Sequence, residues 1–276
     1  MRGLTRKCAY YSGSDVVYPD RKVAVAQGPT VSEPPVVARL YRFQPIRSWP
    51  KWAGDLLEVK TPSNVERKSE RSPAGGSNIN IVLDFLDRTR DVRGDVAECG
   101  VFKGASLAAI ALYVRENRLA KRVFGLDSFQ GFDESVRKDV ALRGAPDAEK
   151  RVGGFGVTSL AQVSRKLAGL DLLDSVTLIE GYFSETLETI RATGFSFVHL
   201  DCDIYDSYRQ TIAYFYPRMS PGGIILFDEY NDPPWPGCNL AIDEFLANKP
   251  EKPVAISMDN YEKYFIQKHP EGAGAR

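Results

Sequence analysis

The sequence predicts an α/β domain built on a doubly wound, mostly parallel sheet of seven strands, with an antiparallel strand at one edge and an N-terminal extension. Two observations carry this prediction. Strand-length apolar segments alternate with helical patterns from residue 77 onward, as right-handed βαβ units require. Two of these segments, at 197–203 and 222–229, end in clustered carboxylates. Long apolar runs are typical of buried parallel strands. Open α/β sheets bind ligands at the carboxyl ends of such strands.

The elements follow in chain order. Residues 1–75 are rich in proline and basic residues, and the charged, loop-like stretch 64–78 closes them, so we treat 1–75 as an extension and 76–276 as the main domain. Apolar runs bounded by turn residues predict strands, and a spacing of three to four between apolar residues predicts helices. The order is helix 81–88, strand 95–100, helix 105–118, strand 122–128, a long polar loop at 132–155, helix 159–167, strand 176–181, a short helix, strand 195–201, helix 208–216, strand 222–228, helix 240–247 and two short antiparallel strands, 253–259 and 264–268.

Composition excludes several classes of protein. The chain has 36 basic and 36 acidic residues, and this balance argues against a nucleic-acid or membrane partner. No segment approaches the roughly 18 apolar residues of a membrane span, and the basic start lacks the apolar run of a secretory signal. We therefore expect a cytoplasmic protein. The four cysteines form no CxxC pair, which favours reduced structural thiols.

The acidic strand ends predict a metal. If the two strands lie side by side, Asp201, Asp203, Asp228 and Glu229 converge on one small volume. Four negative charges there would repel one another unless a cation lay among them, and oxygen ligands favour a hard ion.

A glycine-rich turn precedes this region. In AECGVFKGAS, a strand that ends in Glu98 runs through Gly100 and Gly104 into a helix, so backbone amides can approach a ligand closely. The spacing is GxxxG and not the dinucleotide fingerprint, and a tight turn without a ligand would have the same sequence. Asp127 ends the next strand, where a carboxylate can hold the two hydroxyls of a ribose. A lone aspartate there is more often a cap, but the two features together indicate a nucleoside pocket.

These motifs together resemble the macrocin O-methyltransferase family, S-adenosylmethionine-dependent enzymes that methylate sugar hydroxyls. The resemblance runs from about residue 79 to 268 and is carried by DVAECGVFKGAS, VFGLDSFQGF, VTLIEGYFSETL, FVHLDCDIYDSY, GGIILFDEY and PGCNLAIDEFL. It implies a class I methyltransferase fold, S-adenosylmethionine and magnesium as cofactors, and a small glycosylated or nucleotide-linked sugar as substrate. We also expect a homo-oligomer.

The resemblance also assigns roles to residues. It implies that Asp201, Asp228 and Glu229 hold the magnesium ion and that Asp203 is the general base. The family usually has two aspartates where this chain has Asp228 and Glu229, so direct ligation by Glu229 is left open. The expected cofactor contacts are Glu98, Gly100, Gly104, Ser106, Asp127, Ser128, Gly181, Tyr182, Phe183 and Asp201.

The chemistry of methyl transfer is consistent with these roles. Magnesium chelated by two vicinal hydroxyls favours the alkoxide, and Asp203 can then take the proton. The methyl sulfonium brings its own leaving group, so no enzyme nucleophile is needed.

Several interpretations stay open at this point. His199 is a core residue or a residue that supports the site, the loop at 132–155 is a lid or a surface loop, and Trp235 stacks on a sugar or stiffens a turn. Tyr182 and Phe183 contact adenine or pack under the sheet. Two rival functions are a Rossmann-type oxidoreductase and a non-catalytic methyltransferase-like protein whose basic N-terminal segment binds a partner.

Overall fold

The computed structural model describes residues 76–142, 152–258 and 261–269. The predicted N-terminal extension, residues 1–75, therefore lies outside the described residues, as does the middle of the loop predicted at 132–155. Among the helices of the described residues, none is long and apolar enough to cross a membrane.

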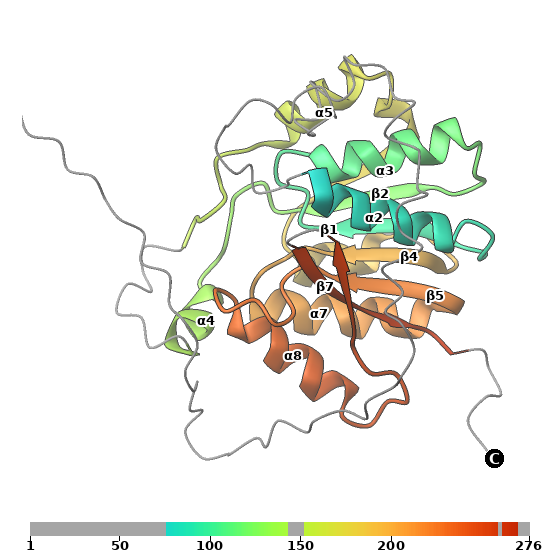
Figure 1. Ribbon diagram of the computed structural model, residues 1–276. Coiled ribbons are helices and arrows are strands. Elements are labelled where there is room, and N and C mark those ends of the chain that lie inside the picture. The colour runs from blue at the N-terminus through green and yellow to red at the C-terminus, as the bar shows by residue number, and fades with distance from the viewer. Residues whose placement is uncertain (1–75, 143–151, 259–260, 270–276) are drawn as a thin grey trace, which may run out of the picture. The chain divides into compact units, whose positions relative to one another are not determined.

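A seven-stranded sheet forms the centre of the described domain (Figure 1). Its strands lie in the order β3 (Val176–Glu180), β2 (Val123–Asp127), β1 (Asp95–Cys99), β4 (Phe195–Leu200), β5 (Met219–Phe227), β7 (Tyr261–Gln267) and β6 (Val254–Met258). The pairs from β3 to β5 are parallel, whereas β7 runs antiparallel to both β5 and β6. The predicted doubly wound sheet with antiparallel pairing at one edge is confirmed. The strand order reverses between β1 and β4, which is where such sheets bind ligands.

Helices cover both faces of the sheet (Figure 1). One face packs on α2 (Gly76–Arg88), α3 (Ala105–Glu116) and α5 (Leu160–Gly169), and the other on α7 (Tyr205–Phe215) and α8 (Pro236–Leu246). Neighbouring residues of a strand point to opposite faces. Val96 accordingly belongs to the apolar cluster with α2 and α3, and Ala97 to the cluster with α7 and α8. Burial on both faces explains why these strands are almost wholly apolar.

The predicted elements are present, with differences at their ends. The helix α7 begins at Tyr205 and not at residue 208, and a helix not predicted, α4 (Val136–Leu142), lies inside the loop predicted at 132–155. The two differences share a cause, because Asp139 of α4 is buried and both of its carboxylate oxygens accept the Tyr205 backbone N–H, at 3.1 and 3.0 Å. Satisfying the first amides of a helix stabilises its start, and here the acceptor comes from a segment 66 residues away.

Candidate functional site

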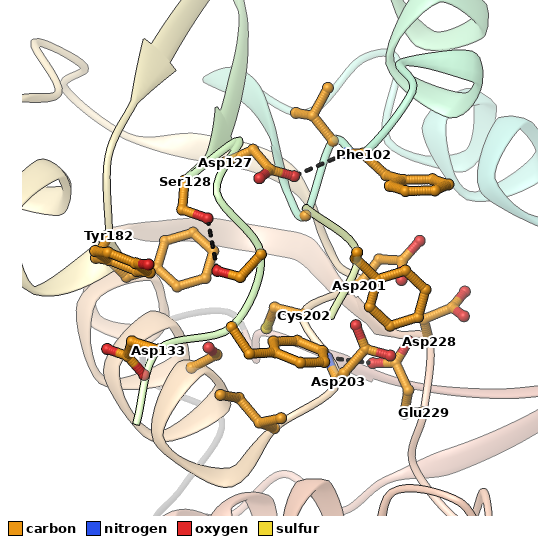
Figure 2. Close-up of a pocket in the computed structure, with 18 of the residues that line it drawn as sticks. Phe102, Asp127, Ser128, Asp133, Tyr182, Asp201, Cys202, Asp203, Asp228 and Glu229 are labelled. Atoms are coloured by element: carbon orange, nitrogen blue, oxygen red, sulfur yellow. Dashed lines mark hydrogen bonds between the residues drawn. The ribbon is translucent and has the colours of Figure 1, made fainter. Parts of the chain in front are cut away.

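A cavity of about 390 Å³ opens where β1 to β5 end. This volume is within the usual range of small-molecule sites. Figure 2 shows its two sides: Asp127, Ser128 and Tyr182 gather on one, and the carboxylates that follow β4 and β5 gather on the other. Of the expected cofactor contacts, Gly100, Ser106, Asp127, Ser128, Gly181, Tyr182, Phe183 and Asp201 line this cavity, whereas Glu98 and Gly104 do not.

The glycine turn brings the ends of β1 and β4 together. Gly100 has a φ of +92°, and a Cβ atom built on it would lie 1.6 Å from the Asp201 carbonyl oxygen. Only glycine fits such an approach. Gly104, at φ +75°, precedes α3 without a side-chain cap, and it packs on Val163 rather than on the cavity. The first amides of α3 have no partner within the helix, and Ala105 and Ser106 at this end line the cavity. A helix N-terminus in this position suits a carboxylate or another anionic group.

Asp127 organises the first of these two sides of the cavity. Its Oδ2 accepts the Phe102 N–H at 2.7 Å (Figure 2). Its Oδ1 accepts the Phe129 N–H, also at 2.7 Å. Phe102 and Phe129 have positive φ angles of 48° and 52°, so the carboxylate fixes two sparsely populated turns. Each carboxylate oxygen keeps acceptor capacity for a ligand hydroxyl. The geometry can therefore position a ribose diol.

The end of β3 closes the same side. The Gly181 N–H donates to the Asp127 carbonyl oxygen at 3.0 Å, and Gly181 has a φ of +137°. Tyr182 and Phe183 follow and line the cavity, although Phe183 also packs against the apolar cluster around α7 and α8. Partial burial, with Asp133 and Glu185 nearby, raises the pKa of Tyr182. Aromatic side chains there can pack on a planar ring such as adenine.

The opposite side holds a cluster of carboxylates. One oxygen each from Asp201 and Asp228 and one nitrogen of His199 lie within 4.8 Å of one another. Burial and the neighbouring Asp228 charge raise the pKa of Asp201 to about 7. Burial acts in the same direction on Asp228, but the Lys263 ammonium and His199 hold the pKa of Asp228 well below its usual range. A divalent cation would relieve the repulsion that raises the pKa of Asp201, so the two aspartates fit a magnesium ion in donor type and charge.

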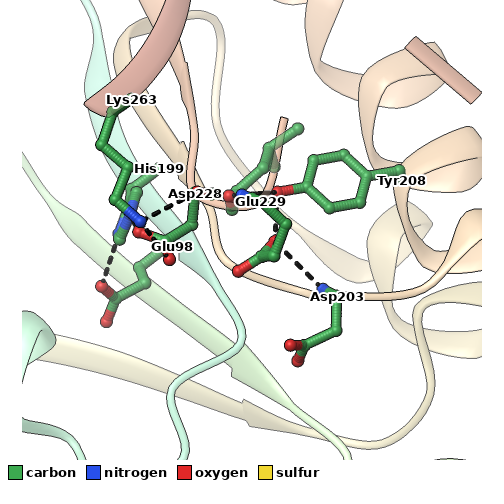
Figure 3. A network of polar contacts seen from close by, with 8 residues as sticks. Glu98, His199, Asp203, Tyr208, Asp228, Glu229 and Lys263 are labelled. Atoms are coloured by element: carbon green, nitrogen blue, oxygen red, sulfur yellow. Dashed lines mark hydrogen bonds and ion pairs between the residues drawn. The ribbon is translucent and has the colours of Figure 1, made fainter. Parts of the chain in front are cut away.

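Glu229, the third expected metal ligand, lines the cavity and has hydrogen-bond partners of its own. Its Oε2 lies 2.5 Å from the Tyr208 hydroxyl and 3.2 Å from the Asp203 backbone N–H (Figure 3). The Tyr208 hydroxyl also donates to the Leu200 carbonyl oxygen, at 2.7 Å. Burial, together with Asp201 and Asp203, raises the pKa of Glu229 well above its ordinary value. The Glu229 side chain thus bonds to Tyr208 and also lies beside Asp201, and its ligation of a metal stays a prediction.

Asp203 lines the cavity, but it lies beyond the end of β4 and its backbone is not extended. β4 ends at Leu200, and Asp203 has a left-handed φ of +60°. Burial, followed by the charges of Asp201 and Asp228, raises the pKa of Asp203 well above its ordinary value. A carboxylate with a raised pKa is a stronger proton acceptor, which suits a general base.

Sequence reasoning missed a buried polar chain behind the carboxylates. The Nδ1 of His199 lies 2.9 Å from Glu98 Oε1, and its Nε2 lies 3.4 Å from Asp228 Oδ1 (Figure 3). Burial disfavours the charged imidazole, but the hydrogen bonds to Asp228 and Glu98 outweigh it and raise the pKa of His199 to about 10. Glu98, fully buried, therefore supports His199 instead of contacting the cavity. The register that places Glu98 beside His199 joins β1 to β4, so no local signal could have revealed it.

The described ends of the loop predicted at 132–155 form a wall of the cavity. Its two arms are joined by backbone hydrogen bonds from the Phe132 N–H to the Gly154 oxygen and from the Gly153 N–H to the Phe132 oxygen. The Phe132 ring lies 5.4 Å from that of Phe155 and 5.5 Å from that of Trp235, and all three line the cavity. Trp235 therefore belongs to an aromatic wall that can pack on a ring of a ligand.

Comparison with known proteins gives consistent results. The family model of macrocin-O-methyltransferases matches residues 80–267. Demethyldecarbamoylnovobiocin O-methyltransferase of Streptomyces niveus is 28% identical over 221 residues, covering 79% of this chain and 78% of that protein. Mycinamicin III 3''-O-methyltransferase of Micromonospora griseorubida is 32% identical over 181 residues, covering 63% of this chain and 68% of that protein. The solved structure of the O-methyltransferase NovP superposes with a TM-score of 0.64 at 25% identity, covering 78% of this chain and 88% of that one.

Proposed function

Because the chain belongs to the macrocin O-methyltransferase family, we propose that it transfers a methyl group from S-adenosylmethionine to a sugar hydroxyl of a small glycoside. The observation that carries the proposal is one cavity with two unlike sides, a carboxylate at Asp127 with acceptor capacity left for ligand hydroxyls and a cluster of acids around Asp201 and Asp228. Membership of a methyltransferase family removes the oxidoreductase and non-catalytic alternatives.

The residues of the cavity have separable tasks in this reaction. S-adenosylmethionine supplies the methyl group and its own leaving group. Asp127 would hold the ribose hydroxyls, and the α3 amides near Ser106 would face the carboxylate of the cofactor. The aromatic wall would keep water away from the reacting atoms. These contacts align the acceptor oxygen with the methyl carbon, which is the main contribution the protein makes to this chemistry.

The acidic side would prepare the acceptor. Asp201 and Asp228 would hold a magnesium ion, which when bound lowers the pKa of a coordinated hydroxyl. Asp203 would accept the hydroxyl proton, since it lines the cavity and has a raised pKa. Glu229 would orient the Asp203 backbone through its hydrogen bond to the Asp203 N–H.

The charge of the cavity favours a glycoside over a nucleotide-linked sugar. Among the described residues that line it, the basic one is Lys103, and the acidic ones are Asp127, Asp133, Asp201, Asp203, Asp228, Glu229 and Asp232. A diphosphate would bring further negative charge into this cluster, at a Coulomb cost that one bound cation only partly offsets. A neutral or cationic glycoside, whose aglycone packs on Phe132, Phe155 and Trp235, has no such cost.

The experiment measures methyl transfer by mass spectrometry. The purified protein is incubated with S-adenosylmethionine and a panel of glycosides and nucleotide diphosphate sugars, with magnesium or after exhaustive EDTA treatment. We expect magnesium-dependent methylation of glycosides. Methylation of nucleotide sugars alone would overturn the substrate class, and full activity in EDTA would overturn the metal.

Two variants separate the roles of the aspartates. Asp201→Asn should weaken metal binding, so excess magnesium should restore part of the rate. Asp203→Asn cannot accept the proton, so turnover should fall by roughly 100-fold to 10,000-fold at every magnesium concentration. If magnesium restored Asp203→Asn and not Asp201→Asn, the two roles would be reversed.

A further inference from the structure

Lys263 occupies a position in the acidic cluster that the proposed reaction does not use. Its Nζ lies 2.6 Å from Asp228 Oδ2 and 2.8 Å from the Asp228 carbonyl oxygen (Figure 3). The side chains of Lys263 and Asp228 are only 10% and 14% exposed. We propose that Lys263 is a built-in cation that competes with the divalent metal for Asp228 and so weakens metal binding. This inference rests on the proposed metal site.

The position of Lys263 follows from the antiparallel strand. β7 pairs with β5 so that Tyr264 lies opposite Phe227. Continuing this register by one residue places Lys263 opposite Asp228, just where β5 ends. The main-chain contact with the Asp228 carbonyl oxygen holds the ammonium at this point. The contact therefore belongs to the architecture of the sheet and not to a chance approach of a surface lysine.

The contacts of Asp228 show why a metal would have to compete. Its Oδ2 is bound by Lys263, and its Oδ1 lies 3.4 Å from His199 Nε2. A divalent ion that used this carboxylate would lie close to the Lys263 ammonium. Because both side chains are largely buried, solvent and salt screen the repulsion between these two cations only in part. The ammonium also neutralises part of the acidic cluster when no metal is bound.

The test is direct metal binding, with manganese as the probe and without cofactor or acceptor. The free Mn²⁺ signal in electron paramagnetic resonance gives the dissociation constant for the wild-type chain, Lys263→Met and Lys263→Arg. A matched control is Lys268→Met, which removes a lysine just after β7 whose Nζ lies 3.9 Å from Glu251 Oε1 and packs over the Tyr216 ring. Lys263→Gln carries the test if Lys263→Met does not fold.

We expect Lys263→Met to bind Mn²⁺ at least about tenfold more tightly than the wild type, while Lys263→Arg and Lys268→Met stay close to the wild type. Binding of Mn²⁺ by Lys263→Met and not by the wild type would also support the inference. An unchanged dissociation constant would overturn the inference and leave the metal site intact. Weaker binding by Lys263→Met would also overturn the inference, because Lys263 would then help to position Asp228 for the metal. No binding by any of these chains would overturn the inference and the proposed metal site together.

Discussion

Replacing Gly100 by alanine should disable the site while leaving the chain folded. The new Cβ atom would lie 1.6 Å from the Asp201 carbonyl oxygen, and it has to move to at least 3.0 Å. The shift is resisted on both sides, because the Gly100 N–H donates to Leu126 and the Asp201 N–H donates to Cys99, both at 2.9 Å. Any movement that removes the clash therefore displaces the glycine turn or the strand end that carries Asp201.

The structure gives the size of the effect. A non-glycine residue at φ +92° costs about 1 to 2 kcal/mol, and weakening the two backbone hydrogen bonds adds about 1 kcal/mol each. A loss of about 3 kcal/mol lowers the melting temperature of a domain of this size by about 6 to 12 °C. Misplacement of reacting groups by about 1 Å costs on the order of 100-fold in rate, so kcat/KM should fall by at least that factor.

The assay compares Gly100→Ala with Gly169→Ala in thermal unfolding, S-adenosylmethionine titration and methyl transfer. Gly169 ends α5, and nothing lies within 4 Å of a Cβ atom built on it. The control should therefore keep normal activity and an unchanged or slightly higher melting temperature. Normal activity and stability of Gly100→Ala would refute the close approach of β1 and β4 on which the site depends.

Three further results are expected. Asp127→Ala should weaken S-adenosylmethionine binding in calorimetry by more than tenfold, since hydrogen bonds to a charged acceptor contribute about 1.5 to 3 kcal/mol each, and an unchanged affinity would remove Asp127 from the site. Asp139→Ala should lower the melting temperature by a few degrees, because the start of α7 loses its acceptor, and it should raise the KM of the acceptor more than it lowers kcat. In EDTA, thermal stability should fall as pH rises from 6.5 toward 10: the folded-state pKa of His199, about 10, lies above its ordinary value of 6.5, so the stability it contributes is complete below 6.5 and lost by 10. A His199→Gln variant should show a shallower slope, and an equal slope would contradict this account.

The sequence alone determined the architecture and which strand ends form the candidate site. Strand-length apolar runs that alternate with helical patterns predict a doubly wound sheet, because a strand buried on both faces is apolar along its whole length. The same holds for Asp127, Asp201 and Asp228, since the carboxyl ends of parallel strands meet at one edge whatever the side chains around them. Gly100 could also be predicted, because glycine in a turn from strand to helix allows the backbone to approach a neighbouring group closely.

The tertiary structure decided how these residues are connected. Asp139 of α4 satisfies the start of α7, Glu98 supports His199 across β1 and β4, Glu229 turns to Tyr208, and Lys263 meets Asp228 across β5 and β7. Each pair joins segments between 21 and 101 residues apart. Propensity and periodicity report only on near neighbours in the chain, whereas strand register and helix packing set these contacts, so the charge state of the candidate site is decided only in the folded sheet.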